Sequence, residues 1–551
     1  MSKAPGHKIE VNEARPSKAN LVHSGQALSL VDWLDVSWFY PEGFRKERVV
    51  ETQRSLIVIG DSLAYKFLKP EPYSGPIVSF AERWRKACEE IRSNRELAPD
   101  LYFGVRLLRW IDEEPQWITE YRGNDLDPNN APLDADEVAI VMQRIPAGVR
   151  LPEILLREEV LSRKQIGDVV DILANFHMRR KREAIRYFVD DPEARIDSLE
   201  DRVLGESDRF MRVYGSFLDP FSQAALREAS SYLKGHFEGF KNSLFTRGQQ
   251  GLLLDYHGDL RQEKICLEPI REEARAISIF GRVVRPGRFG DVLEDLASLN
   301  ASLAVRQHHE VADGIVAAYR ERRAEVFDES LFRFYTVSAL LHRAQHLFLE
   351  NLEKNAFEAQ VHLALALRHS LGIERPFVLG VGGGVLDQVD EVAKSVAELL
   401  GIPRVHYRQF AEGTGHAWGP DELVFERMMR SLEDLLRSGT AAVIVWPLNR
   451  AEERLKLAAL ARRFQALNLS VKCERGGIGA IDSEAPQQNR SFGEDFPSRR
   501  LWHADSESWN ETSREAPYML LEPSLAPHEL ALLIARGLRD IAANCEPPQK
   551  L

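Results

Sequence analysis

Short apolar runs bounded by turn residues predict strands in the first 150 positions, with one helical segment among them. Residues 55–60 and 64–69 predict two strands joined by a turn at 60–61. Residues 79–97 predict a helix, because the apolar positions 84, 87, 88 and 91 share one side of it. Two further strands are expected at 101–110 and 116–121. This part of the chain should form a small sheet with one helix.

From about position 151 the apolar residues recur with the helical period, which predicts several packed helices up to residue 245. Short strands are expected within 252–269 and 274–284, flanking a loop, and helices resume from 291 to about 370. The break at 372–376 ends them, because its proline stops a helix and restricts the preceding residue. We expect a domain boundary there.

Beyond this break, predicted strands and helices alternate. Strands are expected at 377–381, 404–410, 441–446 and 470–474, and helices at 390–401, 422–439 and 451–467. Such alternation predicts a mostly parallel sheet covered by helices on both faces. Residues 475–500 are rich in Gly, Pro, Ser and charge and predict a mobile insertion, and residues 1–27 predict a disordered tail.

Composition narrows the classes of function. The chain of 551 residues has 72 Lys and Arg against 84 Asp and Glu, a formal charge of −12, which argues against nucleic-acid binding. Four cysteines lie far apart without zinc-ligand spacing, so we expect buried reduced thiols at Cys88, Cys266, Cys473 and Cys545. The polar N-terminus and the lack of a long apolar window predict a cytosolic protein without a membrane span.

Six local motifs follow one another within residues 28–371. They are GDSLAYKFLKP (60–70), ERWRKACEEIRSNRELAPDLYFGV (82–105), AIVMQRIP (139–146), LANFH (173–177), HGD (257–259) and DVLEDLASL (291–299). In this order they resemble the aminoglycoside-phosphotransferase type of protein-kinase-like fold. More closely, the chain resembles a bacterial two-domain family that carries a C-terminal P-loop kinase domain of the AAA or zeta-toxin type.

The resemblance implies a fold class and a division of the chain. An α+β kinase-like domain is expected at 28–371, with an N-lobe at about 28–145 and a helical C-lobe at about 146–371. An α/β P-loop-like domain with a mostly parallel sheet is expected at 377–551.

The resemblance also assigns chemical roles. Phosphoryl transfer needs a lysine on the nucleotide phosphates, an aspartate that deprotonates the acceptor hydroxyl, and ligands for Mg²⁺. Lys66 takes the first role, with Glu89 or Glu90 to orient it, and Asp259 takes the second. His257 of the HGD loop is expected to hold backbone geometry rather than to move protons.

Both positions that should hold the metal have changed. Lys264 replaces an asparagine and Gly281 replaces an aspartate of the family pattern, and Arg282 follows directly. Mg²⁺ prefers oxygen ligands, so we expect no metal site and no required cofactor. Lys264 and Arg282 could neutralise phosphate without a metal, which leaves weak ATP binding open.

A glycine-rich turn between a predicted strand and a predicted helix is the second candidate phosphate site. A working loop reads GxxxxGK[ST]. Counted from its first glycine, position 385 is valine; aligned instead on the glycine run, Leu386 and Asp387 take the lysine and hydroxyl places. Neither alignment therefore yields the lysine and the Ser or Thr that the motif requires. The remaining candidates for a nucleotide contact are Gly380, Gly382, Gly383 and Gly384.

Charge and packing argue against phosphate binding at this turn. An aspartate at its mouth repels phosphate, although free amides and the helix dipole favour an anion. Trp446 also stands where the family's second motif has a carboxylate. We therefore expect the glycines to serve a tight turn.

Three hypotheses of function remain. The first is a pseudokinase-like protein that binds, regulates or scaffolds, with a protein partner if it is a scaffold. The second is an ATP-dependent phosphotransferase acting on an alcohol group through Lys66 and Asp259, with an inactive C-terminal domain. The third is another nucleotide-dependent transfer, such as nucleotidyl transfer, which no residue specifically favours.

Overall fold

A computed structural model describes most of the chain. The described residues are 33–34, 40–41, 44–52, 55–69, 79–112, 114–123, 126–158, 160–271, 274, 277–282, 289–323, 328–383, 386–411, 422–448, 450–473, 517–521 and 525–544. The expected tail at 1–27 and the expected insertion at 475–500 lie outside them. None of the helices in these ranges is both long enough and apolar enough to cross a bilayer.

The chain divides into two compact units. The first comprises Met1–Arg95 and Pro99–Ile145, and the second comprises Glu96–Ala98 and Pro146–Leu551. The finer division between 371 and 377 stays a prediction.

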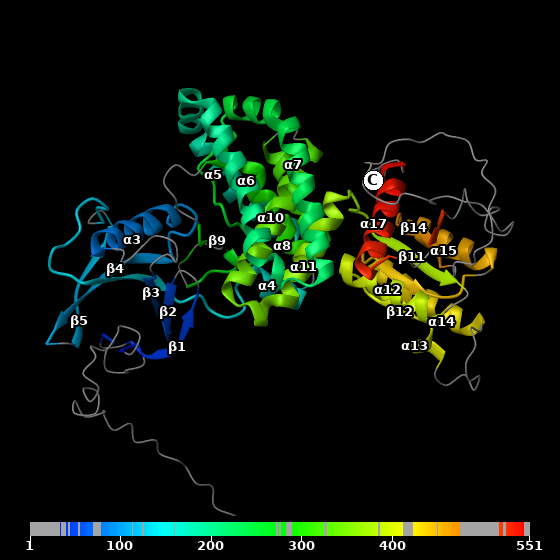
Figure 1. Cartoon of the computed structure of the whole chain (residues 1–551). Coiled ribbons are helices and arrows are strands. Elements are labelled where there is room, and N and C mark those ends of the chain that lie inside the picture. The colour runs from blue at the N-terminus through cyan, green and yellow to red at the C-terminus, as the bar shows by residue number, and fades with distance from the viewer. Residues whose placement is uncertain are drawn as a thin grey trace, which may run out of the picture. The chain divides into compact units, whose positions relative to one another are not determined.

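The first unit contains a six-stranded antiparallel sheet in the order β1-β2-β3-β6-β4-β5 (Figure 1). Its strands are β1 (Lys46–Glu51), β2 (Ser55–Gly60), β3 (Leu63–Leu68), β4 (Tyr102–Ile111), β5 (Glu114–Arg122) and β6 (Glu137–Gln143). Helix α3 (Phe80–Asn94) packs against β4 and β6. A mixed sheet-and-helix unit of this kind is consistent with the expected kinase-like fold.

Helix α3 forms where the sequence predicts it. Ser79 caps its first turn by accepting a hydrogen bond from the backbone N–H of Glu82, at 3.3 Å. The four apolar positions of the predicted stripe are all buried, namely Trp84, Ala87, Cys88 and Ile91. Strand β6 is not anticipated, because its run of buried residues hides the period of two that marks a half-buried strand.

The second unit begins with a large helical region. Its helices are α4 (Leu151–Glu158), α5 (Arg163–Asp190), α6 (Pro192–Tyr214), α7 (Pro220–Gln249), α8 (Val292–Ala304), α9 (His309–Arg323), α10 (Glu329–Glu350) and α11 (Leu352–Ser370), with 3₁₀ turns η3 (Gly215–Phe217) and η4 (Gln262–Lys264). Two small antiparallel pairs lie among them: β7 (Leu253–Leu254) with β10 (Gly290–Asp291), and β8 (Ile265–Cys266) with β9 (Ser278–Ile279). These short pairs hold the loop that carries the HGD motif.

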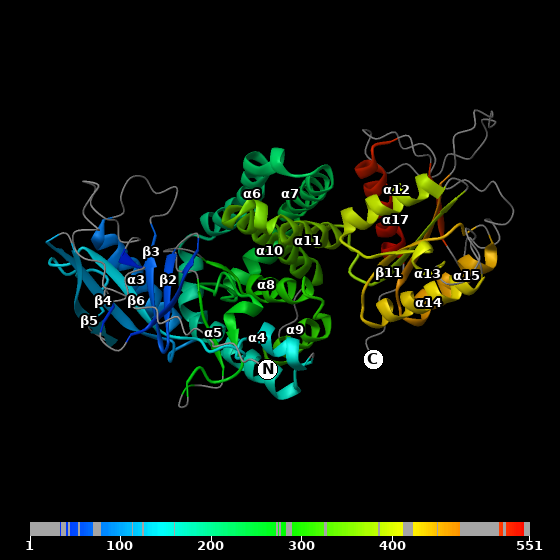
Figure 2. The same ribbon diagram turned by 90° about the horizontal axis from the view of Figure 1, so that it is seen from below.

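The end of the second unit contains the expected parallel sheet, in the order β12-β13-β11-β14-β15. Its strands are β11 (Phe377–Gly383), β12 (Arg404–His406), β13 (Ala442–Val445), β14 (Leu467–Cys473) and β15 (Tyr518–Leu521), and its helices are α12 (Leu386–Leu400), α13 (Arg408–Ala411), α14 (Glu422–Arg437), α15 (Ala451–Arg463) and α17 (Pro527–Asn544). Helices α12 and α17 cover one face, and α14 and α15 the other (Figure 2). Every residue of the central strand β11 is buried.

The described cysteines behave as buried thiols, as expected. Cys88, Cys266 and Cys473 are buried and unpaired, and burial raises the pKa of each thiol to about 12. Such thiols are protonated at neutral pH and have little nucleophilic character. Cys545 lies outside the described residues.

Candidate functional site

Lys66 lies in the middle of β3, between β2 and β6. Its Nζ donates a hydrogen bond of 2.6 Å to Glu90 Oε1 on α3, and the two side chains are only 20% and 15% exposed. Glu89 instead accepts from Arg85 Nη1, at 2.7 Å, one turn earlier on the same helix. Of the two carboxylates considered for orienting Lys66, the pair therefore forms with Glu90. A role of these residues in holding a nucleotide stays a prediction.

Asp259 belongs to the second unit, in the loop that follows β7. Gly258 just before it has a φ of +78°, a left-handed value that glycine adopts without strain and that lets the chain turn sharply. Both oxygens of the Asp259 carboxylate bind Arg261, with Nε to Oδ1 at 2.7 Å and Nη2 to Oδ2 at 3.1 Å. Burial alone would raise the pKa of Asp259, but Arg261 and Lys264 outweigh it and hold that pKa well below its usual range.

His257 has the backbone-holding role that the sequence predicts. It is fully buried, and its Nε2 donates to the carbonyl of Phe280 at 3.1 Å, while its Nδ1 accepts from the backbone N–H of Asp259 at 3.3 Å. One neutral tautomer satisfies both bonds. Burial lowers the pKa of His257 to about 4, although Asp295 and Asp259 act in the opposite direction.

Asp295 on α8 holds the same loop by accepting hydrogen bonds from its backbone. Its two oxygens accept the backbone N–H groups of His257, at 2.8 Å, and Gly258, at 2.9 Å. His177 on α5 donates Nε2–H to Asp295 at 3.2 Å and accepts from the Tyr319 hydroxyl at 2.7 Å through Nδ1. Burial would raise the pKa of Asp295, but the hydrogen bond from His177 and those from the loop backbone lower it. The LANFH, HGD and DVLEDLASL motifs therefore meet in one buried network.

Two arginines, Arg247 buried and Arg202 half-buried, complete the support of α8 and are not anticipated from the sequence. Arg247 on α7 binds Asp291 with two hydrogen bonds, of 2.5 and 2.7 Å, and Arg202 on α6 binds Glu294 in the same manner. Asp291 and Glu294 also form the capping box that starts α8. The D-x-x-E spacing of this box is readable in the sequence, but its arginine partners lie 44 and 92 residues away.

Lys264 and Gly281, the two positions at which the resemblance leads one to expect metal ligands, are in contact with each other. A side-chain carbon built at Gly281 would lie 2.8 Å from Lys264 Nζ and 3.1 Å from Lys264 Cδ. Gly281 has a φ of +76°, and the Lys264 ammonium lies 5.6 Å from the centre of the Phe280 ring. Lys264 therefore occupies the space that a side chain at 281 would need.

Arg282 does not have the exposed position that phosphate neutralisation requires. Its guanidinium donates to the carbonyl of Tyr256 at 3.0 Å, pairs with the Asp255 carboxylate and lies 5.2 Å from the centre of the Phe176 ring. It is 4% exposed. The expectation that Arg282 could take the place of a metal is therefore wrong, because the arginine is used to hold the 255–256 backbone.

The residues around Asp259 do not fit a magnesium ion. The Asp259 oxygens are engaged by Arg261, and the cation of Lys264 lies near enough to lower the pKa of Asp259. Within the part of the chain that the structure describes, no group of three or more His, Cys, Asp and Glu side chains is placed to hold a metal ion. Any phosphate binding at this loop would have to use the cations of Arg261 and Lys264.

The three described glycines of the glycine-rich motif lie within β11 and are closely packed. A side-chain carbon at Gly382 would lie 2.4 Å from the Pro447 carbonyl oxygen and 2.6 Å from that of Trp446, and one at Gly383 would lie 2.2 Å from the Cys473 carbonyl oxygen. A side-chain carbon at Gly380 would lie 2.7 Å from Leu448 Cδ1. These glycines therefore leave no room for a side chain at their positions in the strand.

Trp446 and the residues that follow it pack beside the carboxyl end of β11. The Trp446 ring is buried at the end of β13, with its centre 5.1 Å from that of Phe425. Leu448 is held at a φ of +54°, an uncommon value for leucine, and its carbonyl accepts from Arg454 at 2.7 Å. Gly384 and the side chains of Leu386 and Asp387 lie outside the description. Nucleotide contacts by the four glycines stay a prediction.

Comparison with solved structures gives a distant likeness. No protein-family model matches the chain, and no curated protein resembles it in sequence. A crystal structure of a thermostable mutant of the aminoglycoside phosphotransferase APH(4)-Ia, in its apo form, aligns with 59% of this chain and 95% of its own, at 12% identity and a TM-score of 0.34. A likeness of that size carries no conclusion about activity.

Proposed function

We propose that this chain is a catalytically impaired, kinase-like two-domain protein that acts as a binding, regulatory or scaffolding unit. The observation that carries the proposal is the state of Asp259, whose two oxygens are bound by Arg261. A general base must accept a proton from its substrate, and its strength falls as its pKa falls. A carboxylate with a strongly lowered pKa and an arginine on both oxygens is a weak base.

The glycine turn supports the same proposal independently. At Gly382 and Gly383, the space beside the chain where a side chain would stand is occupied by the carbonyl oxygens of Trp446, Pro447 and Cys473. This close packing of backbone supports a structural role for these glycines. In this proposal the C-terminal sheet and its helices provide a binding surface. A protein partner is expected if the chain is a scaffold.

The first test is a thermal shift of the intact protein with ATP, with and without Mg²⁺, because a ligand stabilises only the state that it binds. We expect no Mg²⁺-dependent rise in the melting temperature. The comparison variant is Lys66→Ala, and the matched control is Lys69→Ala, a lysine at the end of the same strand that pairs with Glu51. A Mg²⁺-dependent rise that Lys66→Ala abolishes and Lys69→Ala leaves intact would contradict the proposal.

The second candidate is an active ATP-dependent phosphotransferase that uses Lys66 and Asp259. One observation favours it: the half-buried ion pair of Lys66 with Glu90 is formed, and such a pair is what positions a phosphate-binding lysine in protein kinases. Turnover of labelled ATP with a pool of small alcohols is the decisive assay. Transfer that is lost in Asp259→Asn and kept in Asp168→Asn, an exposed aspartate on α5, would establish this candidate.

A further inference from the structure

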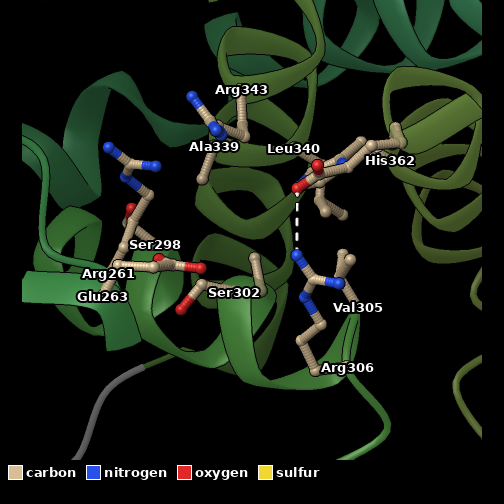
Figure 3. A pocket seen from close by; sticks show the side chains of 12 residues that line it. Arg261, Glu263, Ser298, Ser302, Val305, Arg306, Ala339, Leu340, Arg343 and His362 are labelled. Atoms are coloured by element: carbon tan, nitrogen blue, oxygen red, sulfur yellow. Dashed lines mark hydrogen bonds and ion pairs between the residues drawn. The ribbon is translucent and has the colours of Figure 1, made fainter. Parts of the chain in front are cut away.

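A small pocket lies beside the Asp259 loop, within the second unit, between η4 and helices α8, α10 and α11 (Figure 3). Its charged lining comprises Arg261, Glu263, Arg306, Arg343, Glu358 and His362. The empty space is about 360 Å³ when the open solvent at the mouth is included, so the enclosed part is smaller.

The pocket is rich in hydrogen-bond donors. Arg306 makes one hydrogen bond to Glu358, at 3.4 Å, and Arg343 makes one to Glu350, at 3.3 Å, both at exposed positions. Arg261 uses its Nε and one Nη to hold Asp259. A guanidinium has five N–H groups, so each arginine has further donors for an anionic group.

The pocket also has two acceptors, one of which has no donor among the described residues. The Oε2 atom of Glu263 is shielded from solvent and makes no hydrogen bond with any residue that the structure describes. His362 donates Nδ1–H to the carbonyl of Glu358, at 2.7 Å, so its Nε2 is the acceptor nitrogen of a neutral ring. Figure 3 shows Glu263 extending into the space between Arg261 on one side and Arg306 and His362 on the other.

We infer that this pocket binds a small zwitterion, which presents an ammonium group to Glu263 and a phosphate or carboxylate group to Arg306 and Arg343. A buried carboxylate oxygen without a donor is unfavourable, and an ammonium group supplies both the missing hydrogen bond and the opposite charge. An anion alone would leave that oxygen unsatisfied, and an amine alone would leave the arginines without a ligand. The inference does not depend on whether Asp259 transfers phosphate, and it gives the proposed binding function a ligand class.

The test is calorimetric titration of the full chain with O-phosphoethanolamine, which carries both groups, and with inorganic phosphate and ethanolamine, which carry one each. We expect phosphoethanolamine to bind about tenfold more tightly than phosphate, as one additional charge-assisted hydrogen bond would give. Ethanolamine should be the weakest of the three. Equal affinity for phosphoethanolamine and phosphate, or no binding of either, would overturn the inference.

Two variants assign the binding to this pocket. Glu263→Gln keeps the shape of the side chain and should remove the advantage of phosphoethanolamine over phosphate. Arg306→Gln should weaken both ligands about tenfold, and Arg343→Gln takes its place if the first variant does not fold. Arg437→Gln is the matched control, since that exposed arginine on α14 pairs with Glu433 and Asp434 and does not line the pocket. Binding that survives Glu263→Gln and both arginine variants unchanged would place the ligand elsewhere and sink the inference.

Discussion

Two regions of the second unit look like phosphate sites in sequence but have closed in different ways. At the Asp259 loop the closure consists of side chains: Arg261 holds the carboxylate, and Lys264 lies over Gly281. At the glycine turn the closure consists of backbone, because carbonyl oxygens of Trp446 and Pro447 contact Gly382. Side chains can be removed by substitution without moving the chain, whereas backbone cannot.

This difference has physical consequences. The loop depends on buried charges and hydrogen bonds, so its stability should change with pH and with the loss of single carboxylates. The glycine-rich segment depends on close packing, so the stability of the protein should fall when a side chain is added there. Four substitutions separate the two kinds of closure.

The largest effect is expected from Asp295→Ala. The variant leaves two backbone N–H groups of the loop and the ring of His177 without their buried acceptor, and we expect a loss of ~3–5 kcal/mol in stability. Hydrogen exchange should become fast at the His257 and Gly258 amides while the amides of β11 stay protected. Asp168→Asn, an exposed position on α5, is the control and should change stability by less than ~0.5 kcal/mol. Unchanged exchange in the loop would show that Asp295 does not hold it.

Acid should destabilise the loop through His257. The pKa of His257 is lowered to about 4 in the folded protein, against ~6.5 in an unfolded chain. Its contribution is fully present above the unfolded value and is lost as the pH falls from ~6.5 toward 4, by up to ~3 kcal/mol. His257→Gln should remove this part of the pH dependence in denaturation curves, whereas His236→Gln, an exposed position on α7, should not. Identical curves for the parent and His257→Gln would contradict the buried neutral histidine.

Gly382→Ala tests the backbone closure. The new methyl group would lie within 2.6 Å of two carbonyl oxygens, so we expect a loss of ~1–3 kcal/mol. Gly235→Ala is the matched control, because that glycine in α7 has no neighbouring atom within 4 Å and an alanine there should stabilise the helix by ~0.5–1 kcal/mol. Thermal unfolding of the two variants should therefore shift in opposite directions. A neutral Gly382→Ala would contradict the backbone closure.

The smallest effect on stability is expected from Arg261→Leu, at ~1 kcal/mol, since both partners are partly exposed. The informative readout is the titration of Asp259, followed by carbon NMR of labelled aspartate. Without the guanidinium, the pKa of Asp259 should rise. Arg157→Leu, which breaks an exposed pair with Glu268, should leave that titration unchanged. If Asp259 titrates as before, Lys264 rather than Arg261 holds its pKa down.

The sequence predicts much of the fold, because apolar period and turn residues act locally. The strands around Lys66, the helix over 80–94 and the alternating elements after Pro376 all form near their expected positions. The segment 404–410 shows the limit of such reasoning. Only Arg404–His406 forms a strand, and a short helix follows at Arg408–Ala411.

The candidate sites are predictable in their residue types but not in their pairings. A strand lysine followed by adjacent glutamates on a helix indicates an ion pair, but which glutamate reaches Lys66 depends on how α3 lies against the sheet. The clamp of Arg261 on Asp259 is a local contact, whereas Arg247, Arg202 and Asp295 act across large sequence distances. No periodicity reports such contacts, because they are set by tertiary packing.

The contact between Lys264 and Gly281 couples these two positions to each other. An aspartate introduced at 281 alone would meet the lysine side chain and adopt a left-handed φ, and its carboxylate would be neutralised by the ammonium. An asparagine introduced at 264 alone would still lack a carboxylate partner at 281. Building a magnesium site at this place would therefore require both substitutions together.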